Sequence, residues 1–551
     1  MLSRLRLASI LATIPTFIML VSLSSCGQGP TGDKPMKDTL PVKSQNISDA
    51  SIPGNFSDPG KLRFDSTSLE GFLKKYPDLG GFREDMTKFY AGRNWSYAWY
   101  DDQGLIEASQ DLYNRVGNMT DEGVPFKVPY YDRYKNMIDG KDSLGATSGP
   151  DTDMELMITA QYFNYALKVW SGLPPSATQK IEWYVPRKKI AYDRLLDSML
   201  NAKSSGATLR EPVYHQYGLL RDYLQRLRKL EQAGQWIAIP AQTKSFHMGD
   251  SAEVLALVRK RLFYANDLSS DNGLTIFDAQ LDSGVRSFQR RFGLKEDGVI
   301  GPGMVRELSA PLSHRIRQII VNMERCRWIP DDPKGDYLVV NIPQFKLLVY
   351  ASDTLAWSCN VVVGKDVNKT VIFSGDMKYV VFSPYWNVPP SIYNKEIVPG
   401  MRRNPNYLSQ HNMERTADGV REKPGPKNSL GQVKFLFPNS FNIYLHDTPS
   451  KSLFNEEKRT FSHGCIRVGE PKRLAMHLLR NDQAWDEAKI TQAMNAAKER
   501  FVTLKQSVPV HIVYFTAWVD AQGKLNLRDD VYKRDARLAD MIFEKTAKTG
   551  Q

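Results

Sequence analysis

Apolar residues recur at three- and four-residue spacing through much of the first half of the chain. This is the period of a helix that buries one face, and it predicts helices over residues 105–116, 153–170 and 212–230. Few β-type runs interrupt this pattern. We therefore expect a helical scaffold domain over residues 65–247, with no chemistry of its own.

Residues 248–312 carry a shorter helical pattern. Apolar stripes predict three helices, over 254–262, from Asp278 to Phe292, and over 302–308. Glycines between the last two supply the positive φ that tight turns need. A linking helix is expected within 313–334, capped by Ser313.

The pattern changes after residue 335 to short β-rich runs separated by turn residues, which indicate strands. These runs are 337–342, 346–350, 360–364 and 378–382, with 508–514 as the last strand. They predict a β-rich domain over 335–520, followed by a C-terminal tail over 521–551. Residues 385–435 interrupt the domain with Pro, Gly, Arg and Asn, which is typical of a lid. The expected fold class is α+β, with several domains.

The N-terminus has the pattern of an export signal. Arg4 and Arg6 precede an apolar run over 7–23, and small residues lead to Cys26. The order Leu-Ser-Ser-Cys resembles a bacterial lipobox, in which the cysteine carries lipid; a plain signal peptide is the alternative. Residues 1–25 are then a signal peptide. Residues 26–64, rich in Gly, Pro and Ser, are expected to be a flexible tether.

The composition and net charge limit the class of protein and the classes of molecule that it can bind. Of the 551 residues, 42% are apolar and 24% are charged, which excludes a fibrous or wholly disordered chain. The net charge of +12 suits an anionic polymer or lipid. Because no long Lys/Arg arm is present, we expect no nucleic-acid partner.

The cysteine count points to a reactive thiol. Four cysteines are too few for a disulfide framework in an exported chain of this length. If Cys26 carries lipid, an odd number remains, namely Cys326, Cys359 and Cys465. At least one of them is then a free thiol or is bonded outside the chain.

Two segments of the β-rich domain, 442–449 and 461–468, carry candidate chemistry. A cysteine and a histidine in one domain form a candidate nucleophile and base, because an imidazole can take the proton from a thiol with a pKa of about 8.5. Gly464 allows a tight turn, so successive N–H groups can face an oxyanion. A zinc site would need about four ligands, which these segments lack. We expect no metal and no other cofactor.

These segments resemble a known motif. His446 is followed, after 15 residues, by Ser-His-Gly-Cys-Ile-Arg at 462–467, which is similar to the motif of YkuD-type L,D-transpeptidases. The run 288–302 resembles the small three-helix peptidoglycan-binding domain. The order of scaffold, binding domain, lid and catalytic domain is similar to the large YcbB-like branch over residues 65–530. Cys326, where an aromatic is commoner, and Asn387 depart from that branch.

The resemblance implies roles for single residues. Cys465 is the nucleophile and His446 the general base, whose imidazole is held by the backbone carbonyl of Asp447. The backbone N–H groups of His463, Gly464 and Cys465 form the oxyanion site. Substrate-binding roles fall to Ser462, Arg467, Tyr444 and Trp386, although the last two are equally well explained as core aromatics.

The implied reaction is cysteine acyl transfer within peptidoglycan. Cys465 attacks the third residue of a tetrapeptide stem, releases D-Ala, and passes the acyl group to another stem as a 3→3 cross-link. Carbapenems would then be covalent inhibitors. The implied location is the cell envelope facing the periplasm, anchored by lipid, in the outer rather than the inner membrane. The alternatives are an L,D-carboxypeptidase with the same site, a non-catalytic peptidoglycan-binding lipoprotein, or attachment of another protein to stems.

Overall fold

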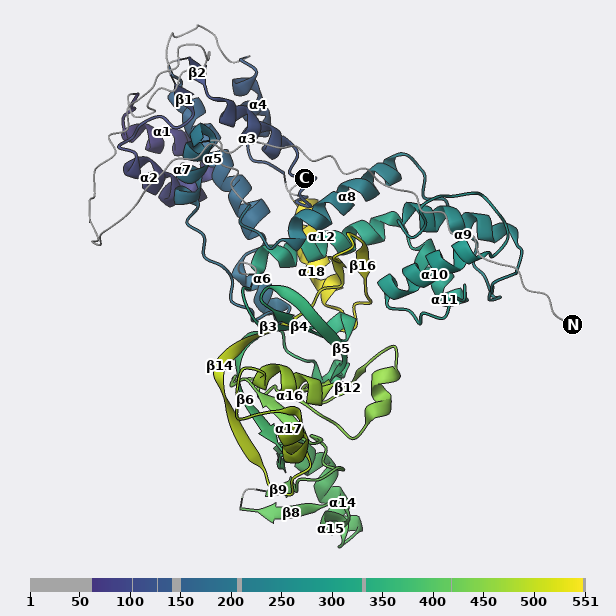
Figure 1. The fold of residues 1–551 in the computed structure, drawn as a ribbon. Helices are drawn as coiled ribbons and strands as arrows, with labels where there is room; N and C mark the ends of the chain where they lie inside the picture. Colours follow the sequence, from purple (N-terminus) through teal and green to yellow (C-terminus); the bar gives the residue numbers. More distant parts are fainter. Residues whose placement is uncertain are drawn as a thin grey trace, which may run out of the picture. The chain divides into compact units, whose positions relative to one another are not determined.

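The computed structural model describes residues 62–101, 103–125, 127–140, 150–205, 211–329, 333–417 and 419–548 (Figure 1). The predicted signal peptide, Cys26 and nearly all of the predicted tether lie outside the described residues. Helical regions and a large mixed sheet are both present, which confirms the α+β fold class. Within the described ranges, no helix combines the length and apolar character needed to cross a membrane.

The first helical region is built around α5 (Thr152–Tyr165), whose side chains are nearly all buried. Its start is fixed by Asp151, whose carboxylate accepts the N–H groups of Asp153 and Met154. The helix expected over 153–170 continues as a π-helical turn, η2 (Ala166–Ser171). The other elements are α1 (Thr67–Lys75), η1 (Pro77–Phe82), α2 (Arg83–Gly92), β1 (Tyr100–Asp101), β2 (Gly104–Leu105), α3 (Glu107–Gly117), α4 (Tyr131–Ile138), α6 (Pro175–Lys180), α7 (Tyr192–Ser205) and α8 (Gln216–Gln232).

The next region has three helices around a core of its own. They are α9 (Glu253–Tyr264), α10 (Ala279–Phe292) and α11 (Pro302–Ser309), close to the predicted ranges. The linking helix α12 (Leu312–Trp328) packs along α8. Its N-cap is Pro311, so the prediction of Ser313 as the cap was wrong. The helix begins at Leu312, a buried residue one position before Ser313.

The β-rich region closes into a barrel. Its sheet has the order β12-β5-β13-β11-β10-β6-β14-β3-β4, and β4 also pairs with β5, so all strands except β12 form a ring. Most neighbours are antiparallel; β11 with β13, β14 with β3, and β12 with β5 are parallel. The strands are β3 (Tyr337–Asn341), β4 (Lys346–Ala351), β5 (Thr354–Gly364), β6 (Ser374–Phe382), β10 (Val433–Leu436), β11 (Leu445–His446), β12 (Thr460–Ser462), β13 (Ile466–Val468) and β14 (Arg500–Val513), with short 3-10 turns η3 (Ile342–Gln344), η4 (Asp366–Asn368) and η6 (Lys451–Asn455) between them.

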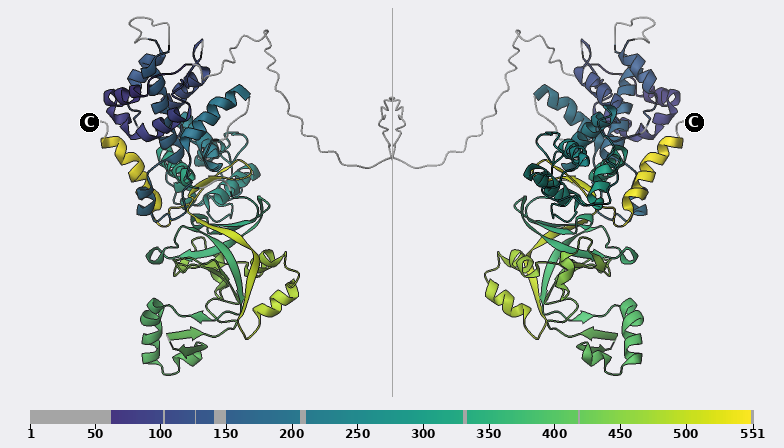
Figure 2. Two further views of the ribbon diagram at one scale, coloured as in Figure 1. Left: turned by 90° about the vertical axis from the view of Figure 1, so that its left-hand side faces the viewer. Right: turned by 90° about the vertical axis from the view of Figure 1, so that its right-hand side faces the viewer.

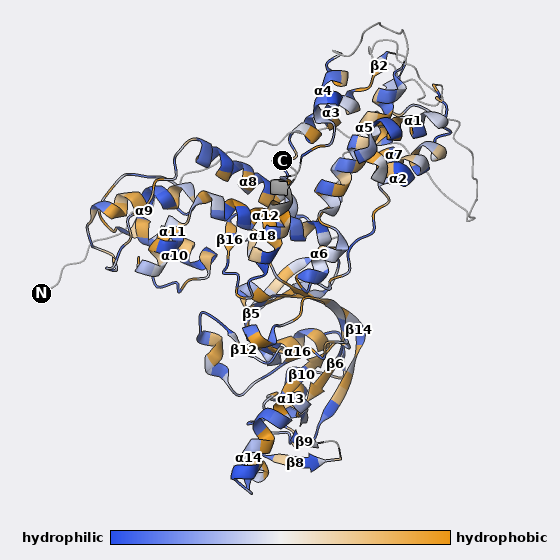
Figure 3. Cartoon of the chain, turned by 180° about the vertical axis from the view of Figure 1, so that it is seen from behind, coloured by the Kyte–Doolittle hydropathy of each residue, from blue (hydrophilic) through white to orange (hydrophobic). Residues whose placement is uncertain are grey.

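Alternation along the strands fills the barrel. Successive side chains of a strand point to opposite faces, so Val361 and Val363 of β5 face the same buried side. Leu445 and Ile466, opposite each other on β11 and β13, are fully buried in the same core cluster. Figure 3 shows hydrophobic residues along the strands of this sheet. The next residues along these two strands, His446 and Arg467, therefore face outward.

The chain after the barrel is folded. The segment expected as a tail contains β16 (Leu525–Leu527), which pairs with β15 (Ala517–Val519), and α18 (Arg534–Lys548), which packs on α12. Two more helices, α16 (Pro471–Leu479) and α17 (Glu487–Met494), lie beside β14 (Figure 2). The expected last strand, 508–514, is the second part of β14, so two strands follow it.

The predicted lid is a small folded unit. Its strands β7 (Trp386–Asn387), β8 (Met413–Thr416) and β9 (Gly419–Glu422) form a sheet of order β7-β9-β8. Its helices are α13 (Pro390–Ile392), η5 (Tyr393–Ile397), α14 (Val398–Arg403) and α15 (Tyr407–Gln410). Ile397, Met413 and Val420 form its own small core. It therefore differs from the structureless stretch that its Pro- and Gly-rich sequence suggested.

Candidate active site

The parallel pairing of β11 with β13 brings the two predicted catalytic residues together. His446 is the partner of Arg467, and Leu445 is the partner of Ile466. Cys465 precedes Ile466, so it lies beside Tyr444 and diagonal to His446 on the outward face of the barrel. Neighbours on one face of adjacent strands lie close enough for their side chains to interact.

The imidazole of His446 has a fixed tautomer. Its Nδ1 lies 2.5 Å from the backbone oxygen of Asp447. Because a carbonyl oxygen only accepts, Nδ1 carries the proton and Nε2 is left with its lone pair. Burial, reinforced by the charge of Arg467, lowers the pKa of His446 to about 3. The ring is therefore a neutral proton acceptor at physiological pH.

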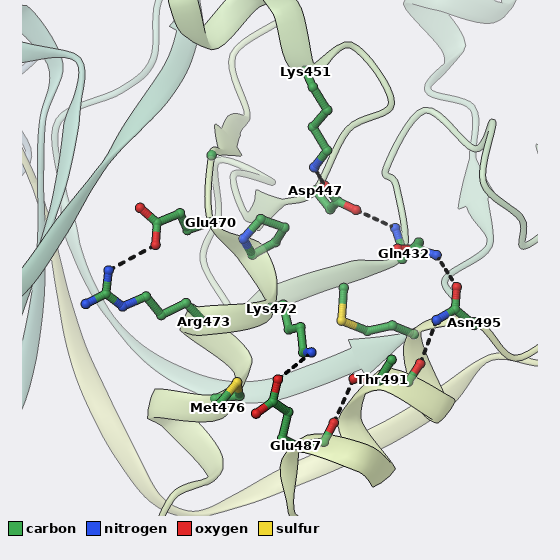
Figure 4. A pocket seen from close by; sticks show the side chains of 13 residues that line it. Gln432, Asp447, Lys451, Glu470, Lys472, Arg473, Met476, Glu487, Thr491 and Asn495 are labelled. Carbon is green, nitrogen blue, oxygen red and sulfur yellow. Dashed lines mark hydrogen bonds and ion pairs between the residues drawn. The ribbon is translucent and has the colours of Figure 1, made fainter.

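Asp447 is held in turn by its own carboxylate. That carboxylate accepts the N–H of Gln432 at 2.9 Å and of Thr448 at 2.7 Å, and it forms an ion pair with Lys451. Gln432, Asp447 and Lys451 line a pocket of about 450 Å³ (Figure 4). Gln432 also donates to Asn495 at 2.7 Å, which ties the arrangement to α17. The carbonyl that orients His446 is thus fixed from two sides.

Gly431 is the residue that lets Asp447 take this position. It has φ of +63°, and a Cβ added to it would lie 2.4 Å from the Asp447 carboxylate carbon. Gly431→Ala should therefore displace Asp447 and with it the imidazole of His446. Misplacement by about 1 Å costs on the order of a hundredfold in rate, which is the loss we expect in the acylation rate of the thiol.

A matched control separates this effect from backbone strain. Gly234 has a similar φ of +61° but no atom within 4 Å of an added Cβ. Gly234→Ala should lower the melting temperature slightly and leave acylation unchanged. Equal acylation rates in the two variants would contradict a role for Asp447 in orienting the base.

The thiol of Cys465 is partly buried and uncharged. It donates to the backbone oxygen of Asn442 at 3.6 Å. Burial raises the pKa of Cys465, although hydrogen bonds from the backbone N–H and hydroxyl of Tyr444 oppose this rise. Among the described residues, no hydrogen bond joins the thiol to His446, and such bonds often tighten only when substrate is bound. A neutral thiol beside a neutral imidazole requires proton transfer during attack.

The turn that carries the thiol is closed by Ser462. The Ser462 hydroxyl donates to the carbonyl of Cys465 at 2.6 Å and accepts the N–H of Gly464 at 3.2 Å. Gly464 has φ of +120°, which side chains rarely allow. The Gly464 N–H, one of the three groups expected to face an oxyanion, therefore has an internal partner here. This leaves the N–H groups of His463 and Cys465 for that role.

Sequence reasoning missed the residues that support this turn. The hydroxyl of Thr370 donates to the carbonyl of Gly464 at 2.8 Å and accepts the N–H of Gly364 at 2.9 Å. Tyr532, beyond the barrel, donates from its hydroxyl to the Gly364 carbonyl at 2.6 Å and accepts the N–H of Thr370 at 3.3 Å. Thr370 and Tyr532 are almost fully buried. No local motif marks them, because the contacts join distant segments.

Arg467 brings an uncompensated charge to the site. Burial lowers its pKa, and its Nε is buried without a hydrogen-bond partner. No carboxylate among the described residues forms an ion pair with it. Burying a charge without a partner is costly, so this guanidinium is suited to an anionic group on a ligand.

The remaining predicted residues connect the site to the lid. Trp386 on β7 hydrogen-bonds with the hydroxyl of Tyr444, whose ring centre is 5.8 Å from that of His446. The Nε2 of His463 lies 3.6 Å from the carboxylate of Glu396 in η5. The structure therefore brings Tyr444 to the thiol and Trp386 to Tyr444, whereas the side chain of His463 meets the lid.

The described residues include no cluster of three or more His, Cys, Asp or Glu side chains placed to hold a metal ion. Cys359 is a buried free thiol on β5, so it is not bonded to Cys326 of α12. Burial raises the pKa of Cys359 to about 11. Its thiol is therefore protonated and enclosed, in contrast to the accessible thiol of Cys465.

Comparison with known families assigns the domains. The model described as "L,D-transpeptidase catalytic domain" (YkuD) matches residues 335–490, which include the base and the thiol turn. Residues 335–490 are an L,D-transpeptidase catalytic domain. A "Scaffold domain" model matches 84–224, and a "Putative peptidoglycan binding domain" model matches 257–308. The domain limits expected from the sequence stay predictions, since each match covers only part of its region.

A curated relative supports this assignment. The chain is 31% identical over 258 residues to the "Putative L,D-transpeptidase" of Haemophilus influenzae. This match covers 43% of the present chain and 52% of the relative. The chain thus spans about half the length of the curated relative that it matches.

Solved structures of L,D-transpeptidases from Xylanimonas cellulosilytica and Stackebrandtia nassauensis are also similar, each at 14% identity. The first match covers 50% of this chain and 100% of that one, with a TM-score of 0.18. The second covers 50% and 97%, with a TM-score of 0.22. Scores this low add nothing to the assignment. The matched YkuD and peptidoglycan-binding domains themselves point to peptidoglycan, and hence to the cell envelope.

Proposed function

We propose that this chain forms 3→3 cross-links in peptidoglycan by acyl transfer through Cys465. The observation that carries the proposal is the pairing of β11 with β13, which sets the accessible thiol diagonal to a neutral imidazole of fixed tautomer. The L,D-transpeptidase catalytic domain that contains both residues supports the same reaction.

The first step forms a thioester. His446 Nε2 takes the thiol proton as the sulfur of Cys465 attacks the carbonyl carbon of the third stem residue. The bond from that carbon to the D-Ala nitrogen breaks, and the proton passes to the leaving amine. In the second step a side-chain amine of another stem attacks the thioester carbonyl and gives a proton to His446. The bond from that carbon to the sulfur breaks, and His446 returns the proton to the thiolate, which restores the thiol. Two lower barriers replace one high barrier, without a cofactor.

Charge on the reacting oxygen is stabilised by backbone donors. The N–H groups of His463 and Cys465 form the oxyanion site. The hydrogen bond from the Ser462 hydroxyl to the Cys465 carbonyl stabilises the turn that carries them. Arg467 binds a carboxylate of the stem peptide, because the described residues supply no anion for it. Trp386 and Tyr444 form the wall of the acyl groove beside the thiol.

The test is incubation of the purified protein with disaccharide-tetrapeptide, followed by mass spectrometry of the products. A cross-linked dimer lighter by one alanine supports the proposal. Conversion only to disaccharide-tripeptide would instead identify an L,D-carboxypeptidase that uses water as the acceptor. Unchanged substrate would favour a non-catalytic peptidoglycan-binding protein. A product joined to a second protein would indicate that stems are attached to proteins.

We propose further that Cys26 carries a lipid that holds the protein at a membrane. Of the two membranes, we propose the outer rather than the inner one. The support is the Leu-Ser-Ser-Cys order after an apolar run. Cys26→Ala should move the protein from the membrane fraction to the soluble fraction and leave the activity of the purified protein unchanged. Wild-type protein found wholly soluble after fractionation would contradict the anchor, and the catalytic proposal would be unaffected.

A further inference from the structure

Two exposed aromatic rings meet near the thiol turn, and they come from different domains. Tyr184 lies in the segment after α6, within the scaffold match, and is 45% exposed. Phe441 lies in the loop before β11 and is 36% exposed. Their ring centres are 5.2 Å apart, and the rings are inclined by 33°. Together they form a continuous apolar surface open to solvent, here called the aromatic platform.

The aromatic platform is held firmly from behind. The Tyr184 N–H donates to the carbonyl of Ile372 at 2.8 Å. The neighbouring residue Trp183 is buried and forms an isolated β-bridge with Ile372. The Phe441 N–H donates to the side chain of Asn439 at 3.0 Å, and its ring packs 5.0 Å from that of Phe373. Both rings are therefore ordered before a ligand arrives, so binding costs little side-chain entropy.

The platform is close to the nucleophile. Phe441 precedes Asn442, whose carbonyl accepts the Cys465 thiol at 3.6 Å. Standard backbone and side-chain dimensions then place the Phe441 ring centre no more than about 14 Å from the sulfur. A group several bonds along the same substrate is therefore within reach of the platform.

We propose that the aromatic platform binds a sugar ring of the donor strand, an inference that rests on the proposed function. The carbonyl attacked in the stem lies three residues from the glycan, and three extended residues span about 10 Å. A pyranose presents a face of C–H groups that packs on an aromatic ring, whereas a stem peptide offers mainly carboxylates, amines and methyl groups. Neither ring carries charge, so the platform matches the sugar better than the peptide.

The test compares two donors, disaccharide-tetrapeptide and the free tetrapeptide, by the rate of D-Ala release. For Tyr184→Ala and Phe441→Ala, kcat/KM on the glycosylated donor should fall by about 3- to 10-fold, mostly through KM. The kcat/KM of both variants with the free tetrapeptide should stay at the wild-type level. Tyr184→Phe and Phe441→Tyr keep the rings and should restore the wild-type value.

The controls make the outcome unambiguous. Leu355→Ala removes another exposed apolar side chain, on β5, and should leave kcat/KM unchanged with both donors. Equal losses on both donors would show that the rings contact the peptide or only stabilise the fold, and no loss on either would also overturn the proposal. No D-Ala release from either donor by the wild-type protein would instead count against the proposed function itself.

Discussion

Cys465→Ala should reduce cross-link formation to the background rate while leaving the protein folded. The thiol is the only group at the site that can form the thioester, and its partly exposed side chain contributes little to the core. Intact-mass measurement after incubation with a carbapenem gives a direct readout. The wild-type protein should gain one adduct, located on Cys465, and the variant should gain none.

Cys359→Ala is the matched control for this experiment. It removes a thiol that is 3% exposed, so it should lower the free energy of unfolding by about 1 kcal/mol and leave adduct formation intact. If cross-linking survived at the wild-type rate in Cys465→Ala, or if the adduct formed on Cys359, the nucleophile would be assigned wrongly.

His446→Ala should slow acylation of the thiol by about a hundredfold or more, the usual contribution of a positioned general base. The variant loses the imidazole that accepts the thiol proton, and the pKa of Cys465, raised by burial, keeps the spontaneous thiolate fraction low. Stopped-flow acylation by a carbapenem measures this step alone. Replacing the exposed His247, which lies outside the catalytic domain, by His247→Ala should have no effect.

The pH dependence of the wild-type rate tests the same base. Because the pKa of His446 is lowered to about 3, the imidazole stays neutral as the pH falls through the range where an exposed histidine becomes charged. The acylation rate should therefore be flat between about pH 5 and pH 8. A loss of rate with a midpoint near the ordinary histidine pKa would mean that the base is solvated and differs from the buried ring described here.

Acid should also destabilise the fold through this residue. In the unfolded chain His446 takes up a proton near its ordinary pKa, whereas the folded protein resists protonation down to about pH 3. The unfolded state thus binds more protons between these values, so stability falls as the pH is lowered through this window.

The sequence was sufficient for features that depend on local periodicity. The helix predicted over 254–262 is α9, and the strand predicted over 346–350 is β4, because each has a regular buried face. The lid escaped this reasoning because strands of two to four residues, such as β7, are too short for alternation to show. The helix α18 was missed as well, although its buried face packs on α12.

Within the candidate site, motif spacing marked the reacting groups and missed those that hold them. Thr370 is separated from Gly464 by 94 residues, and Tyr532 from Gly364 by 168. Neither contact leaves a trace in the order of residues, because threonine and tyrosine are common in any β-rich domain. Gly431 could not be predicted from the sequence for the same reason. Glycine is needed there because the carboxylate of Asp447 packs against it in the folded chain.

The tie between Tyr532 and the thiol turn affects when the protein becomes competent. Synthesis proceeds from the N-terminus at about 5–20 residues per second, so the motif at 462–467 emerges seconds before residue 532. Until the last part of the chain arrives, β14 cannot close the barrel and the Gly364 carbonyl lacks its donor. The nascent chain therefore carries its thiol past the ribosome before the turn that holds it is supported.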